Sequence, residues 1–281
     1  MLFDKDNKML FIDGAMGTEL QKRGLKPGDM PDLMNISAPD AVQEIHELYI
    51  KAGSDIICTN TFGANAFALR DTNHTPEEII SAAVSIAKRA AGGAKTKVAL
   101  DIGPIGQLLE PVGDLDTIQA GLIFTQQAIA GEKAGVDIIV IETMSDLNEM
   151  ELAIRAVKEN TQLPVITTMT FNKNGRTFMG ADVDSFIALA EDMGVSALGM
   201  NCSLEPKEVY PVAERFAEIA KLPLVFKLNA GLPDGVTGKY SVSPEAFAEQ
   251  LLPYVELGMK IVGGCCGTSP EYIRELRKLL R

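Results

Sequence analysis

The stretch DIIVIETMSDLNEMELAIRAVKEN, residues 137–160, contains one copy of the unit that decides the fold. Residues 137–143 form a short run that is mostly apolar rather than alternating, as expected for a strand buried on both faces of a parallel sheet. Ser145-Asp146-Leu147 follows as a helix start, because Ser and Asp side chains cap the first turn. The stretch therefore predicts one strand followed by one helix.

The same unit recurs along the 281-residue chain. Amphipathic segments predict helices, such as residues 39–52, which Gly53 ends, and the segment that opens with Thr75 and Pro76. Eight strand–helix units favour an α/β fold, a single-domain (β/α)8 TIM barrel over residues 1–281, with a doubly wound open sheet as the alternative. The eight predicted strands are residues 9–13, 55–61, 97–102, 137–143, 164–170, 197–202, 224–229 and 260–265.

The charge balance argues against several kinds of partner. The sequence has 26 basic and 38 acidic residues, a formal net charge of −12, and no run rich in Lys and Arg. Such a chain repels nucleic-acid phosphates and anionic lipid, so we expect neither nucleic acid nor membrane as a partner. No apolar stretch reaches the roughly 20 residues that span a bilayer, and residues 1–8 lack a signal peptide's apolar core. We therefore expect a cytoplasmic protein with reduced cysteines.

Polar and sulfur-bearing residues collect where the predicted strands end. In a (β/α)8 barrel the chemistry takes place at the C-terminal ends of the strands. The barrel prediction therefore brings these residues to one mouth. They are Asp13, Cys58-Thr59-Asn60, Asp101, Glu142-Thr143, Asn201-Cys202, Asn229 and Cys265-Cys266.

Three cysteines form a candidate metal site. Cys202 ends the sixth predicted strand, and Cys265 and Cys266 end the eighth. Neighbouring strand residues point to opposite faces, so two consecutive cysteines reach one ion only where the strand stops. Gly263-Gly264 and Gly267 are expected to give the backbone the freedom for that turn. Three thiolates suit tetrahedral zinc with one open position, as in catalytic sites.

Other interpretations of the cysteines remain open at this point. Free cysteine often packs as a small buried apolar residue, and Cys265-Cys266 could also form a vicinal disulfide. The spacing alone does not decide between these interpretations and zinc. We assign the fourth cysteine, Cys58, to packing, because the other three already complete a site.

Seven short motifs, taken in order, resemble a known family. Together they are similar to the homocysteine S-methyltransferase domain, above all to the N-terminal homocysteine-binding domain of cobalamin-dependent methionine synthase, over nearly the whole chain. The motifs are Asp13-Gly14-Ala15-Met16-Gly17-Thr18-Glu19, Thr59-Asn60-Thr61-Phe62-Gly63-Ala64, Asp101-Ile102-Gly103-Pro104, Glu142-Thr143, Asn201-Cys202-Ser203, Asn229-Ala230-Gly231 and Gly263-Gly264-Cys265-Cys266-Gly267-Thr268.

The resemblance implies a zinc methyltransferase that converts homocysteine to methionine. Its motifs make Cys202, Cys265 and Cys266 the catalytic zinc ligands, and Asn229 stands where related domains place a fourth, exchangeable ligand. A turn-forming Asn is the alternative for Asn229. The substrate is expected to bind as a zinc thiolate, because the metal lowers the thiol's pKa while four thiolates keep the sulfur electron-rich.

Two groups of residues are expected to hold the amino-acid end of homocysteine. Asp13 and Glu142 are suitable acceptors for its ammonium group, although Asp is also common before a glycine turn such as the one that follows Asp13. The turn after Asp13 offers backbone N–H groups as a nest for the carboxylate. It consists of Gly14, Ala15, Met16, Gly17 and Thr18.

The methyl donor is expected to be methylcobalamin on a partner corrinoid protein. Residues 229–233 resemble the cobalamin-dependent branch, and the sequence has no Trp with which to build an aromatic cage for betaine. Alternatives are a barrel subunit acting on another thiol or methyl donor, and a non-catalytic, zinc-bearing interaction subunit. A Schiff-base aldolase using Lys227 is weaker, because it leaves the three cysteines unexplained.

Overall fold

The computed structural model describes residues 8–235 and 237–280. Within them, eight parallel strands form one sheet in the order β1-β8-β7-β6-β5-β4-β3-β2. A bridge between Ile12 and Ile56 joins the two outer strands of that order, so the sheet closes on itself. The strands are β1 (Leu10–Phe11), β2 (Ile56–Cys58), β3 (Lys97–Ile102), β4 (Ile138–Met144), β5 (Val165–Met169), β6 (Ala197–Cys202), β7 (Leu224–Leu228) and β8 (Met259–Gly264).

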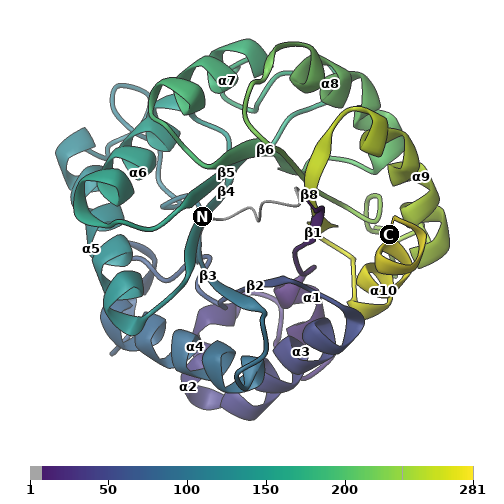
Figure 1. Ribbon diagram of the computed structural model, residues 1–281. Coiled ribbons are helices and arrows are strands. Elements are labelled where there is room, and N and C mark those ends of the chain that lie inside the picture. The colour runs from purple at the N-terminus through teal and green to yellow at the C-terminus, as the bar shows by residue number, and fades with distance from the viewer. Residues whose placement is uncertain (1–7, 236, 281) are drawn as a thin grey trace.

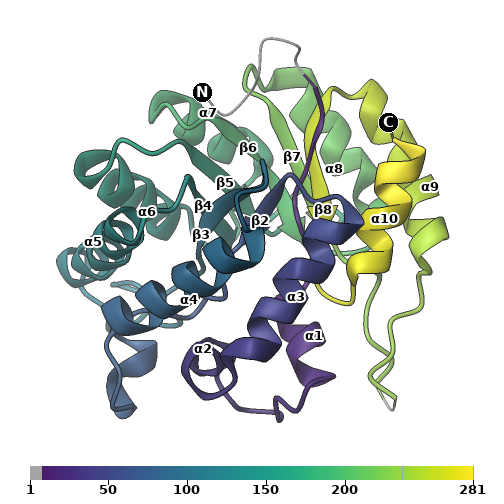
Figure 2. The same ribbon diagram turned by 60° about the horizontal axis from the view of Figure 1, so that its bottom comes forward.

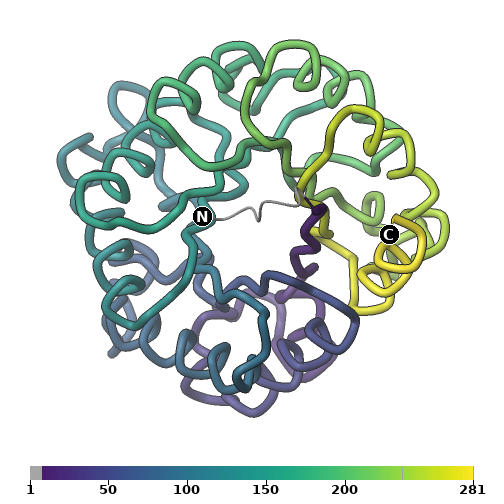
Figure 3. Tube along the Cα trace, viewed as in Figure 1, coloured from purple at the N-terminus to yellow at the C-terminus, as the bar shows by residue number. Residues whose placement is uncertain are grey.

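Helices form an outer ring around these strands (Figure 1). The chain winds once around the barrel axis, so β8 lies beside β1 (Figure 3). This arrangement confirms the predicted (β/α)8 barrel. The α-helices are α1 (Met16–Gln21), α2 (Met34–Ser37), α3 (Pro39–Ala52), α4 (Pro76–Ala91), α5 (Thr117–Ala134), α6 (Leu147–Asn160), α7 (Val183–Asp192), α8 (Pro206–Ile219), α9 (Pro244–Glu256) and α10 (Pro270–Leu279), with 3-10 turns at η1 (Pro31–Leu33) and η2 (Ala68–Asp71).

Local capping fixes where several helices begin. Thr75 caps α4 in a reciprocal capping box with Glu78, and Asp146 accepts a hydrogen bond from the Asn148 N–H at the start of α6. Ser243 likewise accepts from Ala246 N–H at the start of α9. α3 ends at Gly53, whose φ of 112° is one that glycine adopts without strain.

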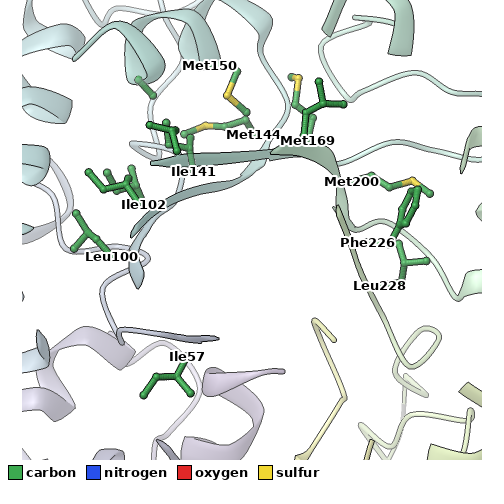
Figure 4. Close-up of a cluster of buried hydrophobic side chains, with 14 of the residues drawn as sticks. Ile57, Leu100, Ile102, Ile141, Met144, Met150, Met169, Met200, Phe226 and Leu228 are labelled. Atoms are coloured by element: carbon green, nitrogen blue, oxygen red, sulfur yellow. The ribbon is translucent and has the colours of Figure 1, made fainter. Parts of the chain in front are cut away.

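The core has two layers, because successive strand side chains point to opposite faces. The outer layer fills the space between strands and helices, as Figure 4 shows for Ile141, Met144 and Met169. The inner layer fills the barrel itself and includes Ile138, Val140, Ile166, Val225 and Ile261. A residue two positions after an inner-layer residue points to the same face of the strand. At the C-terminal end of a strand this residue is polar, as Glu142 is after Val140.

The segments that follow the strands lie at one end of the barrel. In Figure 2, α1 and the segment joining β7 to α9 extend on the same side. None of the helices in the described part of the chain is long and apolar enough to cross a membrane. The predicted lack of a signal peptide concerns residues 1–8, of which residues 1–7 lie outside the described residues.

Candidate active site

The structure brings three cysteine thiols together at the C-terminal end of the barrel. Cys202 is the last residue of β6, and Cys265 and Cys266 follow β8. Their three Sγ atoms all lie within 4.8 Å of one another. The Sγ of Cys202 is 2.7 Å from that of Cys265 and 3.7 Å from that of Cys266. All are free thiols, so the vicinal disulfide is not present.

The backbone around the cysteines adopts conformations that cost energy. Cys202 and Ser203 have φ values of 51° and 61°, in the left-handed region that side chains with a Cβ rarely adopt. Such strain persists only where the surrounding structure enforces it, and it tends to collect at functional sites. It turns the Cys202 side chain at the end of β6 toward the two cysteines after β8.

The glycines beside Cys265 and Cys266 serve a partly different purpose from the one predicted. Only Gly267 has a positive φ, 81°, whereas Gly263 and Gly264 do not. A Cβ on Gly263 would lie 2.6 Å from the Asp13 carbonyl oxygen, and one on Gly264 would lie 2.2 Å from Thr268 Oγ1. These two glycines therefore provide close approach rather than conformational freedom.

A cavity of about 540 Å³ connects the thiols with the ends of the other strands. It brings together every residue that the sequence analysis assigned to metal or substrate except Asn229. It also contains Cys58, Asp101, Thr143 and Lys227. Its predicted members are Asp13, Gly14, Ala15, Met16, Gly17, Thr18, Glu142, Cys202, Cys265 and Cys266.

Lys227 forms a buried ion pair with Glu142 in the lining of this cavity. The side chains of Lys227 and Glu142 are 4% and 8% exposed. Burial lowers the pKa of Lys227, but surrounding acidic groups, with Glu142 and Asp13 among them, outweigh that effect and raise it well above its usual value. Burial raises the pKa of Glu142, and Lys227 opposes that rise. The lysine therefore keeps its charge and balances the carboxylate.

Two further carboxyl groups share the cavity. Burial raises the pKa of Asp13 to about 7 and that of Asp101 well above its usual range, although Lys227 opposes both rises. Asp13 Oδ2 accepts a hydrogen bond of 2.8 Å from the Cys58 N–H. Among the described residues, Asp13 Oδ1 and Asp101 Oδ1 are buried without a hydrogen-bond partner. Both oxygens are thus available to a donor that enters the cavity.

Sequence reasoning gave no role to Asp101 and set Lys227 aside. Each lies two residues beyond an apolar residue of the inner layer, Ala99 and Val225 respectively. That period of two was the available signal, because it places both side chains inside the barrel. Cys58 packs in the inner layer as predicted, and its Sγ also lies 3.8 Å from Lys227 Nζ.

The glycine turn after β1 is fixed against the segment that follows the cysteines. The Ala15 N–H donates to Thr268 Oγ1 at 3.2 Å, so this amide already has a partner. Tyr49 Oη donates to the Ala15 carbonyl at 3.0 Å. A Cβ on Gly14 would lie 2.5 Å from Thr268 Oγ1, so only glycine fits there. The amides of Met16, Gly17 and Thr18 remain the candidates for a carboxylate.

Asn229 lies just after β7 and is not part of the cavity lining. Its Nδ2 donates to the Ser203 carbonyl at 3.1 Å, which links it to the residue after Cys202. Its Oδ1 is buried and has no hydrogen-bond partner among the described residues. An amide oxygen in that situation can accept a donor or ligate a cation.

Comparisons with known proteins find relatives that match nearly the whole chain. The profile of the family described as homocysteine S-methyltransferase matches residues 10–280. Methionine synthase of Mycobacterium leprae (strain TN) is 32% identical over 290 residues, which cover 96% of this chain and 24% of that protein. Methionine synthase of Mycobacterium tuberculosis is 31% identical, covering 98% of this chain and 25% of that protein. The chain thus spans about a quarter of the length of these relatives.

A solved structure shares the fold. The metallated form of the homocysteine methyltransferase MmuM from Escherichia coli superposes with a TM-score of 0.83. The two chains are 21% identical, and the match covers 96% of each. At that identity the likeness shows the fold alone.

Proposed function

The chain belongs to the homocysteine S-methyltransferase family, and we propose that it transfers a methyl group to the sulfur of homocysteine to give methionine. The observation that carries this proposal is the convergence of three free thiols with buried carboxylates in one cavity. The thiols suit a soft metal that binds a sulfur substrate, and the carboxylates suit an ammonium group. Homocysteine carries both groups.

We propose zinc as the resident metal, held by Cys202, Cys265 and Cys266. Zn–S bonds of about 2.3 Å in a tetrahedron place ligand sulfurs about 3.8 Å apart. The 3.7 Å between the Cys202 and Cys266 sulfurs meets this requirement, while the Cys202 and Cys265 sulfurs need to separate by about 1 Å. When bound, zinc supplies a Lewis acid that lowers the pKa of a substrate thiol. The buried, unpartnered Asn229 Oδ1 supports this side chain as the exchangeable fourth ligand.

The cavity residues would bind and orient the amino-acid end of homocysteine. Asp13 and Glu142 accept hydrogen bonds from the ammonium group, and the unpartnered Asp101 Oδ1 offers a further acceptor. Among the described residues that line the cavity, these three carboxyl groups accompany one cation, Lys227. A second positive charge there would favour the ionised forms of Asp13 and Asp101, whose pKa values burial raises. The amides of Met16, Gly17 and Thr18 would hold the carboxylate, because the Ala15 N–H is already bonded to Thr268.

Methyl transfer then needs only an aligned donor. The substrate thiol releases its proton to solvent, its sulfur forms a bond to the methyl carbon, and the electron pair of the breaking donor–methyl bond stays with the donor. The site would hold the sulfur at a fixed point below the open end of the barrel, close to the methyl group. Such proximity can lower the activation free energy by several kcal/mol. We propose that the donor is a methyl-corrinoid on a partner protein and that the reaction takes place in the cytoplasm, where the cysteines stay reduced.

Metal analysis combined with an assay of methionine formation tests this function. We expect one zinc per chain, and methionine from homocysteine and a methyl donor only when zinc is present. Cys265→Ala should lose tight zinc binding and activity but keep the barrel fold, because the apolar layers do not depend on the metal. Cys58→Ala is the matched control and should retain zinc. Stoichiometric zinc in a Cys202/Cys265/Cys266 triple variant would contradict the site.

A further inference from the structure

Every polar atom of the Asn201 side-chain amide makes a hydrogen bond, and two of its partners, Thr143 and Cys265, line the cavity. Its side chain is fully buried at the end of β6, immediately before Cys202. Its Oδ1 accepts hydrogen bonds of 2.8 Å from the Thr143 N–H and from Thr168 Oγ1. Its Nδ2 donates to Thr143 Oγ1 at 2.6 Å and to Cys265 Sγ at 3.9 Å. An amide has two acceptor lone pairs and two N–H donors, and all four are engaged here.

These contacts fix which way the amide points. A backbone N–H can only donate, so the Thr143 N–H requires the amide oxygen on its side. The NH2 group must then face the Cys265 sulfur. Rotating the amide by half a turn would set two donors against each other at Thr143 and would turn an oxygen lone pair toward the sulfur. The N–H···S contact is therefore imposed by the surroundings and is not a free choice of rotamer.

Asn201 also joins the two ends of the proposed substrate site. Thr143 follows Glu142 directly and has a φ of 63°, a conformation that needs to be held in place. The same amide that holds Thr143 contacts Cys265, which lies 64 residues further along the chain than Asn201. One side chain thus connects the carboxylate end of the cavity to the thiol end.

We propose that Asn201 is a positioning residue that orients the Cys265 sulfur for the metal by an N–H···S hydrogen bond and holds the Glu142–Thr143 corner beside it. This inference rests on the proposed zinc site. A hydrogen bond to a ligating sulfur stabilises its ionised form and sets its direction. Partners of this kind around metal ligands typically change metal affinity by 10- to 100-fold when they are removed.

Two substitutions at Asn201 and one matched control test the proposal. Asn201→Asp keeps the shape and an acceptor for the Thr143 N–H and Thr168 Oγ1 but replaces the N–H that faces sulfur by an oxygen. Asn201→Ala removes every contact. Thr168→Val removes one hydrogen bond from the same amide and leaves the N–H···S contact in place. Each protein is purified with zinc, and thermal unfolding is measured to compare folding.

The first readout is the rate of zinc release to a chelator, and the second is the thiolate-to-metal charge-transfer band of the cobalt(II)-substituted protein. We expect roughly 10- to 100-fold faster release and a shifted band for both Asn201 variants, and wild-type values for Thr168→Val. If Asn201→Ala does not fold, the isosteric Asn201→Asp carries the test.

Three results would overturn the proposal. Wild-type zinc release and an unchanged cobalt band in Asn201→Asp would show that the N–H···S contact has no effect. Equal effects of Thr168→Val and Asn201→Asp would show a general packing role. A wild-type protein that binds no zinc at all would overturn the proposed function, and this inference with it, so the two failures are distinguishable.

Discussion

In the proposed substrate complex, Glu142 pairs with two cations, the ammonium group of Lys227 and that of homocysteine. Lys227 is already paired with Glu142 in the structure, and both side chains are almost fully buried. This pairing makes Glu142 a fixed acceptor, because leaving either partner without the other in a buried site costs several kcal/mol. Lys227, which the sequence analysis considered as a Schiff-base residue, thus balances the charge of Glu142 and fixes its orientation.

Glu142→Gln should therefore weaken homocysteine binding by about 1.5–3 kcal/mol, the scale of a hydrogen bond to a charged group. The variant loses the negative charge that attracts the substrate ammonium and also leaves the Lys227 charge unbalanced. Calorimetric titration measures the change, and zinc content should stay the same. A thiol of the same length without an amino group should bind both proteins equally. Unchanged homocysteine affinity in the variant would refute the assignment.

Asp13 gives the site a pH dependence that has a definite sign. Its pKa is raised to about 7 by burial, so it is protonated at lower pH and accepts an ammonium group only once ionised. Binding of α-aminobutyrate, which has no thiol to titrate, should strengthen by roughly tenfold from about pH 6 to about pH 8. Asp13→Asn should flatten this dependence. A wild-type profile that is already flat over this range would show that Asp13 does not contribute.

The raised pKa of Asp13 also makes the stability of the fold depend on pH. Between the usual value of 3.8 and about 7, the folded chain holds a proton on Asp13 that the unfolded chain has lost. Folding therefore becomes less favourable as the pH rises through this window, because the folded state then binds more protons than the unfolded state. Asp13→Asn should remove this part of the dependence in urea unfolding measurements.

Local sequence patterns located the eight strands, although not all of their bounds. The strand predicted at residues 55–61 is β2, Ile56–Cys58, and ends three residues earlier than predicted. The predicted strands at residues 97–102 and 197–202 and the predicted helix at residues 39–52 have the bounds of β3, β6 and α3. β1 is shorter than predicted, Leu10–Phe11 instead of residues 9–13, because Ile12 makes only an isolated bridge to Ile56. β8 begins and ends one residue earlier than predicted.

Contacts between distant strands could not be predicted in the same way. Lys227 meets Glu142 across 85 residues of sequence, and Asn201 meets Thr143 across 58. These pairs depend on the register of strands around the barrel and on the inward direction of particular side chains. The period of two along a strand predicts the inward direction, but no local pattern predicts the register that pairs these residues across the barrel. The cysteine cluster could be predicted because three rare thiols stand at strand ends.

Gly267, in the turn after β8, is required both by its backbone conformation and by its neighbour Tyr240. Gly267→Ala should lower stability and zinc affinity, because its φ is 81° and an added Cβ would lie 2.2 Å from the Tyr240 ring. Gly238→Ala is the matched control, since Gly238 has a φ of 66° but no atom within 4 Å of the added Cβ. The control should show only the backbone cost of about 1 kcal/mol and wild-type zinc release. Equal zinc release from both variants would show that the Tyr240 contact does not support the site.

In the whole molecule, the candidate active site lies at one open end of the barrel. The cavity opens among the segments that follow the strands, where Phe62 lines it and is 41% exposed. Phe178 and Leu232, in segments that follow β5 and β7, are also exposed. A donor has to approach the thiols from this end, because the inner apolar layer fills the barrel below them. This geometry suits a large donor that covers the mouth.

The open mouth also bears on which methyl donor the chain uses. With homocysteine as acceptor, the chain should form methionine readily from methylcobalamin, free or on a corrinoid protein, and slowly or not at all from betaine. A quaternary ammonium donor is best held by aromatic faces, above all Trp, and the sequence has no Trp and only 6% aromatic residues. Each donor is offered separately at equal zinc loading, with methionine measured over time. Saturable turnover of betaine together with inactivity toward methylcobalamin would place the donor site within the cavity instead of on a partner.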